Sequence, residues 1–404
     1  MMKLKRLSLC VLSLLLAVAM LFPLASCGNK PAETLPAATT EAPPKYAIRL
    51  SEISGPVSIH TEKQAAYLAN ADPHSILTYA NATEEISRSQ PIRLTWGIPE
   101  SAVGHVRFYV VRIWTKSDLS DVMEAMVAGN KTEYSFYNAM VGTTYYWNVS
   151  AQDDEGDTST SKTSTFETDA KCPRNLYVDS VTNVRDAGGW ATEDGGRVRQ
   201  GLLYRGARLN KDFGTDVTVS AEGIKTLRDG LGIKTEVDLR KTTAVNGSNE
   251  SGGRTVSSLG TRVNYRACPM EYGTVLITDP KNIERVREIF ALLADESNYP
   301  IYVHCSIGTD RTGLIVWLVN GLCGVSENDL WRDYLFSDFG QIESEPTKAR
   351  TRAKNEDVYV NQIKAQSGDS FAEQTYNFLK DYFGVPESDL QAVIRIMKES
   401  PNAN

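Results

Sequence analysis

The stretch that decides the fold of this chain is His304-Cys305-Ser306-Ile307-Gly308-Thr309-Asp310-Arg311-Thr312-Gly313. An apolar segment at 299–304 precedes it and predicts a strand, and residues 311–323 are apolar nearly all round, which predicts a buried helix. A loop between a strand and a helix N-terminus directs backbone N–H groups and the positive end of the helix dipole at one spot. The stretch therefore predicts a phosphate site within an α/β domain.

Cys305 and Arg311 supply the chemistry at this spot. A cysteine in such a field has a depressed pKa, and its thiolate is the nucleophilic form. The planar guanidinium of Arg311 can hold two phosphate oxygens. The order His-Cys, five residues, Arg, Thr and Gly resembles the signature loop of the cysteine-dependent phosphatases. The alternative is a buried cysteine beside an arginine that caps a helix.

Three further motifs resemble one branch of these phosphatases, the bacterial and fungal tyrosine-phosphatase-like proteins, some of which act on phosphotyrosine and phosphoinositides. They are Thr182-Asn183-Val184-Arg185-Asp186-Ala187-Gly188-Gly189-Trp190, Gly201-Leu202-Leu203-Tyr204-Arg205 and Glu236-Val237-Asp238-Leu239-Arg240. With the signature loop, the resemblance covers about residues 172–345. It implies a central, mostly parallel sheet flanked by helices, and a cysteinyl-phosphate intermediate formed on Cys305.

The resemblance also implies roles for the residues around Cys305. His304 orders the loop backbone, and Asp186 and Arg205 line the pocket or brace it. Asp310 is the general acid, although Asp279 is a competing candidate on a separate loop, and Asp279 followed by Pro280 is also typical of a helix start. Substrate binding is expected from the loop itself, and the residues assigned to it are Ser306, Ile307, Gly308, Thr309, Thr312 and Gly313.

One departure from this branch bears on the substrate. The branch usually has a lysine at the loop position that Thr309 occupies here, and that lysine supplies charge for additional phosphates. Phosphotyrosine or another monoester therefore fits better than a phosphoinositide. No cofactor or metal is expected, because no His/Cys/carboxylate cluster has ligand spacing. The rival interpretations are a sulfurtransferase of the rhodanese type and a surface protein that binds phosphorylated ligands without catalysis.

The N-terminus resembles a bacterial lipoprotein signal. Lys3, Lys5 and Arg6 precede an apolar run at 7–24, and small residues lead to Cys27. We expect residues 1–26 to be a signal peptide, Cys27 to carry a lipid that anchors the protein outside the cytoplasm, and residues 27–45 to be a flexible tether. An ordinary secretory signal is the alternative. Without 1–26 the formal charge moves from -7 to about -10, which argues against nucleic acid as a partner.

Residues 46–170 are assigned to an all-β sandwich region, because short alternating segments such as 106–115 and 163–168 are separated by turns. Over about 88–170 the pattern resembles a fibronectin type III module, with Trp96 on an early strand and Tyr145 at the tyrosine corner. Residues 46–87 have no assigned structure. The acidic stretch 153–157 is interpreted as a solvated hairpin turn rather than a calcium loop.

Residues 171–404 are assigned to the α/β phosphatase domain. Strands are expected at 175–178, 233–240 and 263–267, and helices at 280–296, from 327 toward 336, at 370–383 and at 387–398. Of the cysteines beyond Cys27, Cys323 lies within the apolar helix and is expected in the core. A bridge between Cys172 and Cys268 is left open, since sequence cannot decide it.

Overall fold

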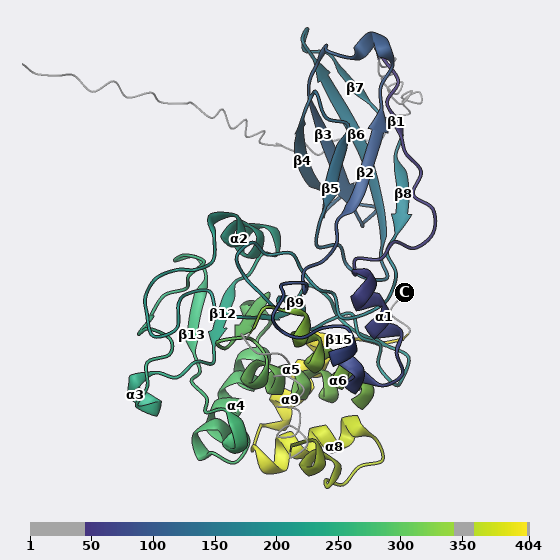
Figure 1. Ribbon diagram of the computed structural model, residues 1–404. Helices are drawn as coiled ribbons and strands as arrows, with labels where there is room; N and C mark the ends of the chain where they lie inside the picture. The colour runs from purple at the N-terminus through teal and green to yellow at the C-terminus, as the bar shows by residue number, and fades with distance from the viewer. Residues whose placement is uncertain (1–44, 343–358, 402–404) are drawn as a thin grey trace, which may run out of the picture. The chain divides into compact units, whose positions relative to one another are not determined.

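The computed structural model describes residues 45–342 and 359–401, and a β-sandwich and an α/β domain account for most of them. Figure 1 shows the strands of the sandwich and the helices of the α/β domain along the chain. The signal segment, Cys27 and the tether up to residue 44 lie outside the described residues. No helix in the described ranges is both long enough and apolar enough to cross a membrane.

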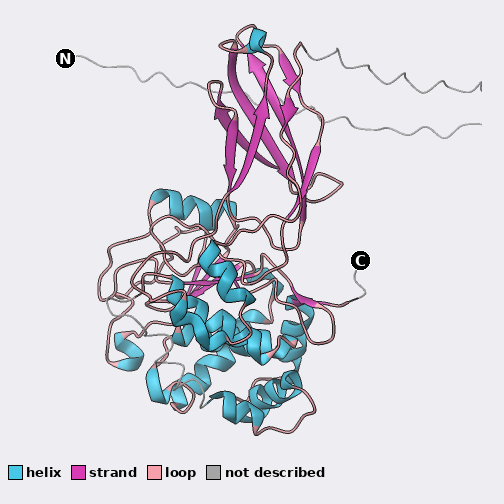
Figure 2. Cartoon of the chain, turned by 45° about the vertical axis from the view of Figure 1, so that its right-hand side comes forward, coloured by secondary structure: helices cyan, strands magenta, loops and turns pink. Residues whose placement is uncertain are grey.

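The sandwich consists of two antiparallel sheets (Figure 2). One sheet has the order β1-β2-β5, and the other has β4-β3-β6-β7 with β8 also paired to β6. The bounds are β1 Arg49–Leu50, β2 Ile92–Gly97, β3 Val106–Trp114, β4 Met123–Ala128, β5 Glu133–Phe136, β6 Thr144–Asp153, β7 Thr158–Thr160 and β8 Ser164–Glu167.

Alternating side chains fill the space between these two sheets. Trp96 and Trp147 are buried, as period-two alternation on β2 and β6 requires. The hydroxyl of Tyr145 accepts a hydrogen bond from the backbone N of Met140 at 2.7 Å. That contact is the tyrosine corner expected of a fibronectin type III module, and it confirms the predicted role of Tyr145.

Part of the region assigned to the sandwich belongs elsewhere. Helix α1 (Glu62–Ala69), which Thr61 and Gln64 start with a capping box, is followed by the 3₁₀ helix η1 (Pro73–Thr78). The ring centroids of His74 in η1 and Trp331 in the α/β domain are 5.0 Å apart. These helices therefore pack on the α/β domain. They lie in residues 46–87, for which the sequence predicts no structure.

The sheet of the α/β domain has the order β13-β12-β14-β11-β9. All neighbouring pairs are parallel except β11 with β9, which confirms the expected mostly parallel sheet. The bounds are β9 Arg185–Asp186, β11 Leu203–Gly206, β12 Thr235–Asp238, β13 Asn264–Ala267 and β14 Ile301–His304. The strand expected at 175–178 is wrong, because only Asn175 forms an isolated bridge, to Arg185.

Helices cover this sheet, and the longest are α4 (Pro280–Leu293) and α5 (Asp310–Cys323). The others are α2 Ala221–Lys225, α3 Thr243–Asn246, α6 Glu327–Leu335, α8 Phe371–Asn377 and α9 Glu387–Met397. Two π-helical turns lie at Thr226–Gly230 and Phe378–Tyr382. Strands β10 (Arg197–Val198) and β15 (Lys398–Glu399) form a short antiparallel pair. Successive residues of β14 are buried on opposite faces of the sheet. Ile301 and Val303 belong to the hydrophobic core around α5, whereas Tyr302 belongs to a second core that contains Leu227.

Candidate active site

The carboxyl ends of three parallel strands meet at the signature loop. In the sheet register, Gly206 of β11 and Asp238 of β12 both lie opposite His304, the last residue of β14. The segments that follow these strands therefore surround Cys305, in the position where ligands bind to α/β sheets. Helix α5 begins at Asp310, one residue before the expected start, and directs its N-terminus at the same point.

The backbone carbonyls of residues 306, 307 and 308 all bind side chains outside the loop. The donors are Arg208 Nη1 at 3.0 Å, Asn183 Nδ2 at 2.9 Å and Arg205 Nη2 at 2.8 Å, in that order. A trans peptide unit is planar, with its N–H and C=O on opposite sides. Because these carbonyls turn outward, the N–H groups of residues 307, 308 and 309 turn toward the interior of the loop.

The amides of residues 306–309 have no hydrogen-bond acceptor within 45–342 or 359–401. Donors of this kind are rarely left unpaired in folded proteins, so the loop has the form of an anion-binding nest. Gly308 is required for it, because its φ is +74° and a Cβ there would lie 2.4 Å from the carbonyl oxygen of Gly206.

Cys305 lies at the base of this nest, and its side chain is buried. Burial raises the pKa of its thiol, but the charge of Arg311 and the adjacent hydroxyl and amide of Thr312 outweigh burial, so the pKa lies below its ordinary value. Cys323, buried in the core without such donors, shows the contrast, because burial raises its pKa to about 12. Cys305 is therefore the thiol that the fold activates as a nucleophile.

Arg311 is held in place by a carboxylate that sequence reasoning missed. Its Nη1 lies 2.6 Å from Glu250 Oε2, and its Nη2 lies 3.4 Å from the hydroxyl of Ser306. The half-exposed ring of Tyr272 covers the guanidinium at 5.1 Å. Glu250 lies in a loop rich in Gly, Ser and Asn, where no pattern in the sequence indicates a partner for an arginine 61 positions away.

His304 contacts both the backbone of Cys305 and a buried carboxylate. Its Nδ1 lies 3.2 Å from the carbonyl oxygen of Cys305, and its Nε2 lies 3.0 Å from Glu236 Oε1. Burial lowers the pKa of His304, but the charges of Asp238 and Glu236 and the hydrogen bond to Glu236 raise it above its ordinary value. The ring thus links the backbone of Cys305 to a buried carboxylate, and its raised pKa makes it poorly suited to releasing a proton.

The two candidate acids differ in their surroundings. Asp310 is the first residue of α5 and is partly exposed beside the nest, and its Oδ1 accepts a hydrogen bond from the hydroxyl of Tyr334 at 2.9 Å. Asp279 instead caps α4 and accepts a hydrogen bond from the amide of Lys281 at 2.8 Å. The helix cap that the Asp279-Pro280 pair predicted is confirmed, and the geometry favours Asp310 as the acid.

Asp186 and Arg205 brace the fold from buried positions. Asp186 pairs with Arg174 at 2.8 Å. Arg205 pairs with Asp333 and donates to the loop carbonyls. Gly313, for which substrate binding stays a prediction, lies within α5, where a Cβ would come within 2.8 Å of the ring of Tyr334.

The remaining loop residues divide by exposure. Ser306 and Ile307 are partly exposed, whereas the side chains of Thr309 and Thr312 are buried. The hydroxyl of Thr312 is one of the groups that lower the pKa of Cys305.

Cys172 and Cys268 are separate buried thiols, so the bridge that the sequence left open is not formed. Two groups of side chains in the described ranges have the composition of a metal site. The first is Glu236, Asp238 and His304. His304 is hydrogen-bonded to Glu236, Glu236 also accepts a hydrogen bond from Ser257, and Asp238 accepts one from Arg240. The second is Asp153, Glu155 and Asp157, where the ammonium of Lys45 lies 2.6–3.4 Å from all three carboxylates.

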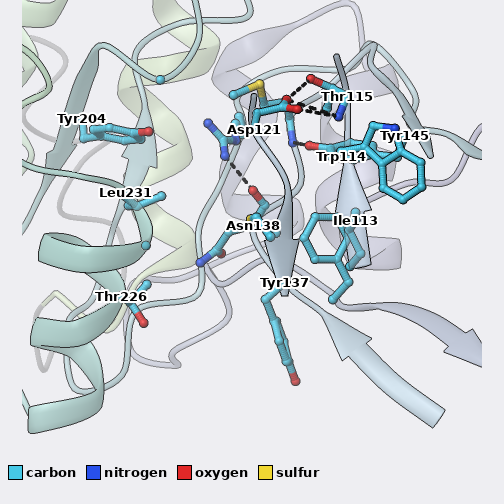
Figure 3. Close-up of a pocket in the computed structure, with 16 residues that line it drawn as sticks. Ile113, Trp114, Thr115, Asp121, Tyr137, Asn138, Tyr145, Tyr204, Thr226 and Leu231 are labelled. Carbon is cyan, nitrogen blue, oxygen red and sulfur yellow. Dashed lines mark hydrogen bonds between the residues drawn. The ribbon is translucent and has the colours of Figure 1, made fainter. Parts of the chain in front are cut away.

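A cavity of about 410 Å³ lies away from the signature loop and is lined by residues of the sandwich and of the α/β domain (Figure 3). Tyr137 and Tyr204 contribute aromatic rings to it. Two charged residues, Asp121 and Arg174, also line it. Asp121 accepts hydrogen bonds from Thr115, and Arg174 forms an ion pair with Asp186. Both charged groups are thus already engaged within the protein, and no residue of 304–313 lines the cavity.

A cysteine thiol in a strand–loop–helix nest of amides, with an arginine six positions later, defines the cysteine-dependent phosphatase class. The tyrosine phosphatase family matches residues 176–402, more than half of the chain, and the fibronectin type III domain matches residues 78–167. The chain therefore belongs to the tyrosine phosphatase family.

Individual relatives are more distant. A Cupriavidus necator protein whose name assigns it as a tyrosine-protein phosphatase is 28% identical over 187 residues, which are 41% of this chain and 63% of that protein. The match thus spans less than two thirds of the relative. The catalytic core of the Saccharomyces cerevisiae PP-IP phosphatase Siw14 is 14% identical, with a TM-score of 0.26 over 43% of this chain and 93% of that core. A fibronectin type III domain of human collagen α-1(XX) is 23% identical, with a TM-score of 0.18 over 21% of this chain and 74% of that domain.

Proposed function

We propose that this chain is a phosphatase that hydrolyses phosphomonoesters through a cysteinyl-phosphate. The inward-facing amides of residues 307–309, beside Cys305 and Arg311, are the observation that carries this proposal. The thiolate of Cys305 attacks phosphorus, and the bond to the leaving oxygen breaks as that oxygen takes a proton from Asp310. The amides and the guanidinium hold the charge on the three equatorial oxygens. Water then attacks phosphorus, returns a proton to Asp310 and releases phosphate and the thiolate.

The test is to replace Cys305 by serine and to measure phosphate release. We expect turnover to fall by at least about a thousandfold, because a hydroxyl is a far weaker nucleophile than a thiolate at neutral pH. Acid quenching of the parent enzyme during turnover should leave a phosphoryl group on the peptide that contains Cys305, detectable by mass spectrometry. Unchanged phosphate release in Cys305→Ser would place catalysis elsewhere, and binding of phosphotyrosine without turnover in the parent would indicate a non-catalytic protein.

The charges around the loop favour a single phosphate as the ligand. Arg208 lies 3.3 Å from Asp212, and Lys241 lies 2.7 Å from Glu271. A cation paired with a carboxylate adds little net potential for a polyanionic substrate. Phosphotyrosine also has a leaving group with a pKa of about 10, which departs more readily than an alkoxide. We therefore propose protein phosphotyrosine as the substrate.

A substrate panel tests this choice. The panel contains a phosphotyrosine peptide, a phosphoserine peptide and a phosphoinositide in mixed micelles, all at the same concentration. We expect kcat/KM to be highest for the phosphotyrosine peptide and lower for both the phosphoserine peptide and the phosphoinositide. A higher kcat/KM on the phosphoinositide would favour the lipid substrate. Replacing Arg208 and Lys241 separately by Gln would then show whether those cations bind the additional phosphates.

We further propose that the enzyme acts outside the cytoplasm, anchored by a lipid on Cys27. Support comes from the basic start, the apolar run and the small residues that precede Cys27. In a bacterial host, the full chain should partition with membranes, and Cys27→Ser should release it or leave it unprocessed. Equal membrane partitioning of Cys27→Ser would contradict the lipid anchor.

A further inference from the structure

Tyr334 connects helix α6 to the proposed acid. Its side chain is 1% exposed, and its hydroxyl donates a hydrogen bond to Asp310 Oδ1 at 2.9 Å. Asp310 lies at the partly exposed edge of the nest, whereas Tyr334 approaches it from within the protein. The hydroxyl thus fixes one carboxylate oxygen of Asp310 from the side opposite solvent.

The ring of Tyr334 packs against two residues, and its neighbour Asp333 anchors the same turn of α6. The ring lies against Gly313, where a Cβ would stand 2.8 Å from ring atom Cδ2, so the glycine of the signature loop leaves the space that the ring fills. The ring of Trp331 meets that of Tyr334 edge-on, with centroids 6.1 Å apart. The preceding residue, Asp333, pairs with the buried guanidinium of Arg205, which donates to the loop carbonyls of residues 308 and 309.

We propose that Tyr334 is a positioning residue that holds the carboxyl group of Asp310 for proton donation to the leaving oxygen. This inference rests on the proposed function of Asp310. In the first step the O–H bond of the Asp310 carboxyl breaks, the proton bonds to the leaving oxygen as the P–O bond breaks, and Asp310 becomes a carboxylate. The hydroxyl of Tyr334 keeps its own proton throughout.

The hydrogen bond favours this step because its strength changes during it. A hydroxyl bound to a carboxylate makes a stronger hydrogen bond than the same hydroxyl bound to a neutral carboxyl group. The contact from Tyr334 to Asp310 therefore strengthens as the proton leaves. The gain matters most for substrates whose leaving oxygen needs the proton, namely alkyl esters, and least for activated aryl esters.

The test is Tyr334→Phe, which removes the hydroxyl and retains the ring that packs on Gly313. We expect kcat/KM to fall about five- to tenfold on an alkyl phosphate such as phosphoserine peptide, and less than about twofold on p-nitrophenyl phosphate. In the double variant Tyr334→Phe, Asp310→Asn, removal of the hydroxyl should cause no further loss, because the group that it positions is already absent.

Tyr299→Phe is the matched control, since the buried hydroxyl of Tyr299 donates to the carbonyl of Leu293 at 2.6 Å, away from the loop. It should leave the ratio of the two kcat/KM values unchanged. Equal losses on both substrates in Tyr334→Phe, or an additional loss in the double variant, would show a structural role only and overturn the proposal.

The control on the proposed function is Asp310→Asn alone. If this change leaves alkyl and aryl rates in the parent ratio, Asp310 is not the acid and the role of Tyr334 falls with it. If Asp310→Asn lowers the alkyl rate selectively and Tyr334→Phe does not, only the positioning role fails.

Discussion

Asp333 is the carboxylate on which the inner side of the signature loop depends, and its replacement by alanine should destabilise the α/β domain strongly. Its Oδ1 lies 2.9 Å from Arg185 Nε and its Oδ2 lies 2.5 Å from Arg205 Nη1, and all three side chains are buried. Removing one partner of a buried ion pair costs about 3–5 kcal/mol, because the other charge is left uncompensated. Here two cations lose their partner.

Other acceptors offset part of this cost. Arg185 also donates to Asn183 and to the backbone carbonyl of residue 333, and Arg205 donates to the carbonyls of residues 308 and 309. We therefore expect Asp333→Ala to lower the free energy of unfolding by about 3–4 kcal/mol. For a domain of this size the loss corresponds to a fall in Tm of about 6–16 °C, measurable by circular dichroism.

The pH dependence of this loss gives a second test. Burial raises the pKa of Asp333, but the charges of Arg185 and Arg205 outweigh burial, so the folded pKa lies below the ordinary value. A carboxyl group of this kind stabilises the fold above its unfolded pKa of about 3.9, and the contribution is lost as the pH falls through the folded pKa. The difference in Tm between the parent and Asp333→Ala should therefore be constant above about pH 5 and shrink below about pH 4.

The control is Glu133→Ala, which removes an exposed ion pair with Arg93 in the sandwich and should change Tm by less than about 2 °C. A fall in Tm for Asp333→Ala no larger than that of the control would refute the reasoning, as would a difference that grows at low pH.

Two further predictions concern the nucleophile and its arginine. Glu250→Ala frees the guanidinium of Arg311 from its 2.6 Å contact and should raise the inhibition constant of inorganic phosphate about tenfold, whereas Glu250→Gln, which can still accept a hydrogen bond, should restore most of the affinity. An unchanged constant in Glu250→Ala would contradict the clamping role. Thr312→Val removes a hydroxyl that lowers the pKa of Cys305, so the pH midpoint for alkylation by iodoacetamide should move upward in the absence of substrate. Identical pH profiles for the parent and Thr312→Val would exclude that contribution.

Local patterns in the sequence were sufficient for the centre of the site. A strand, a five-residue loop and a buried helix are contiguous, so the relation between Cys305 and Arg311 follows from short-range geometry alone. The cap of α4 at Asp279 and the left-handed end of α5 at Gly324 are equally local. The tyrosine corner at Tyr145 is confirmed for the same reason, since its partner Met140 is five residues away.

The surroundings of the site were decided by tertiary structure. Glu250, Asn183 and Asp333 are polar residues in segments far along the chain from the groups they bind, and nothing local distinguishes them from solvated side chains. Their roles arise only when parallel strands bring separate loops to one edge of the sheet.

Long-range packing also decides the surroundings of Gly313, because the ring of Tyr334, 21 positions later, occupies the space beside it. Helix α1 and η1 were not foreseen because they pack on partners more than 250 residues away: His74 meets Trp331 of α6, and Tyr67 meets Phe339, which follows α6. The sequence alone thus predicted which atoms react, and only long-range packing determined which side chains hold those atoms in place, because hydrogen bonds and ion pairs of this kind depend on proximity in space and leave no period in the chain.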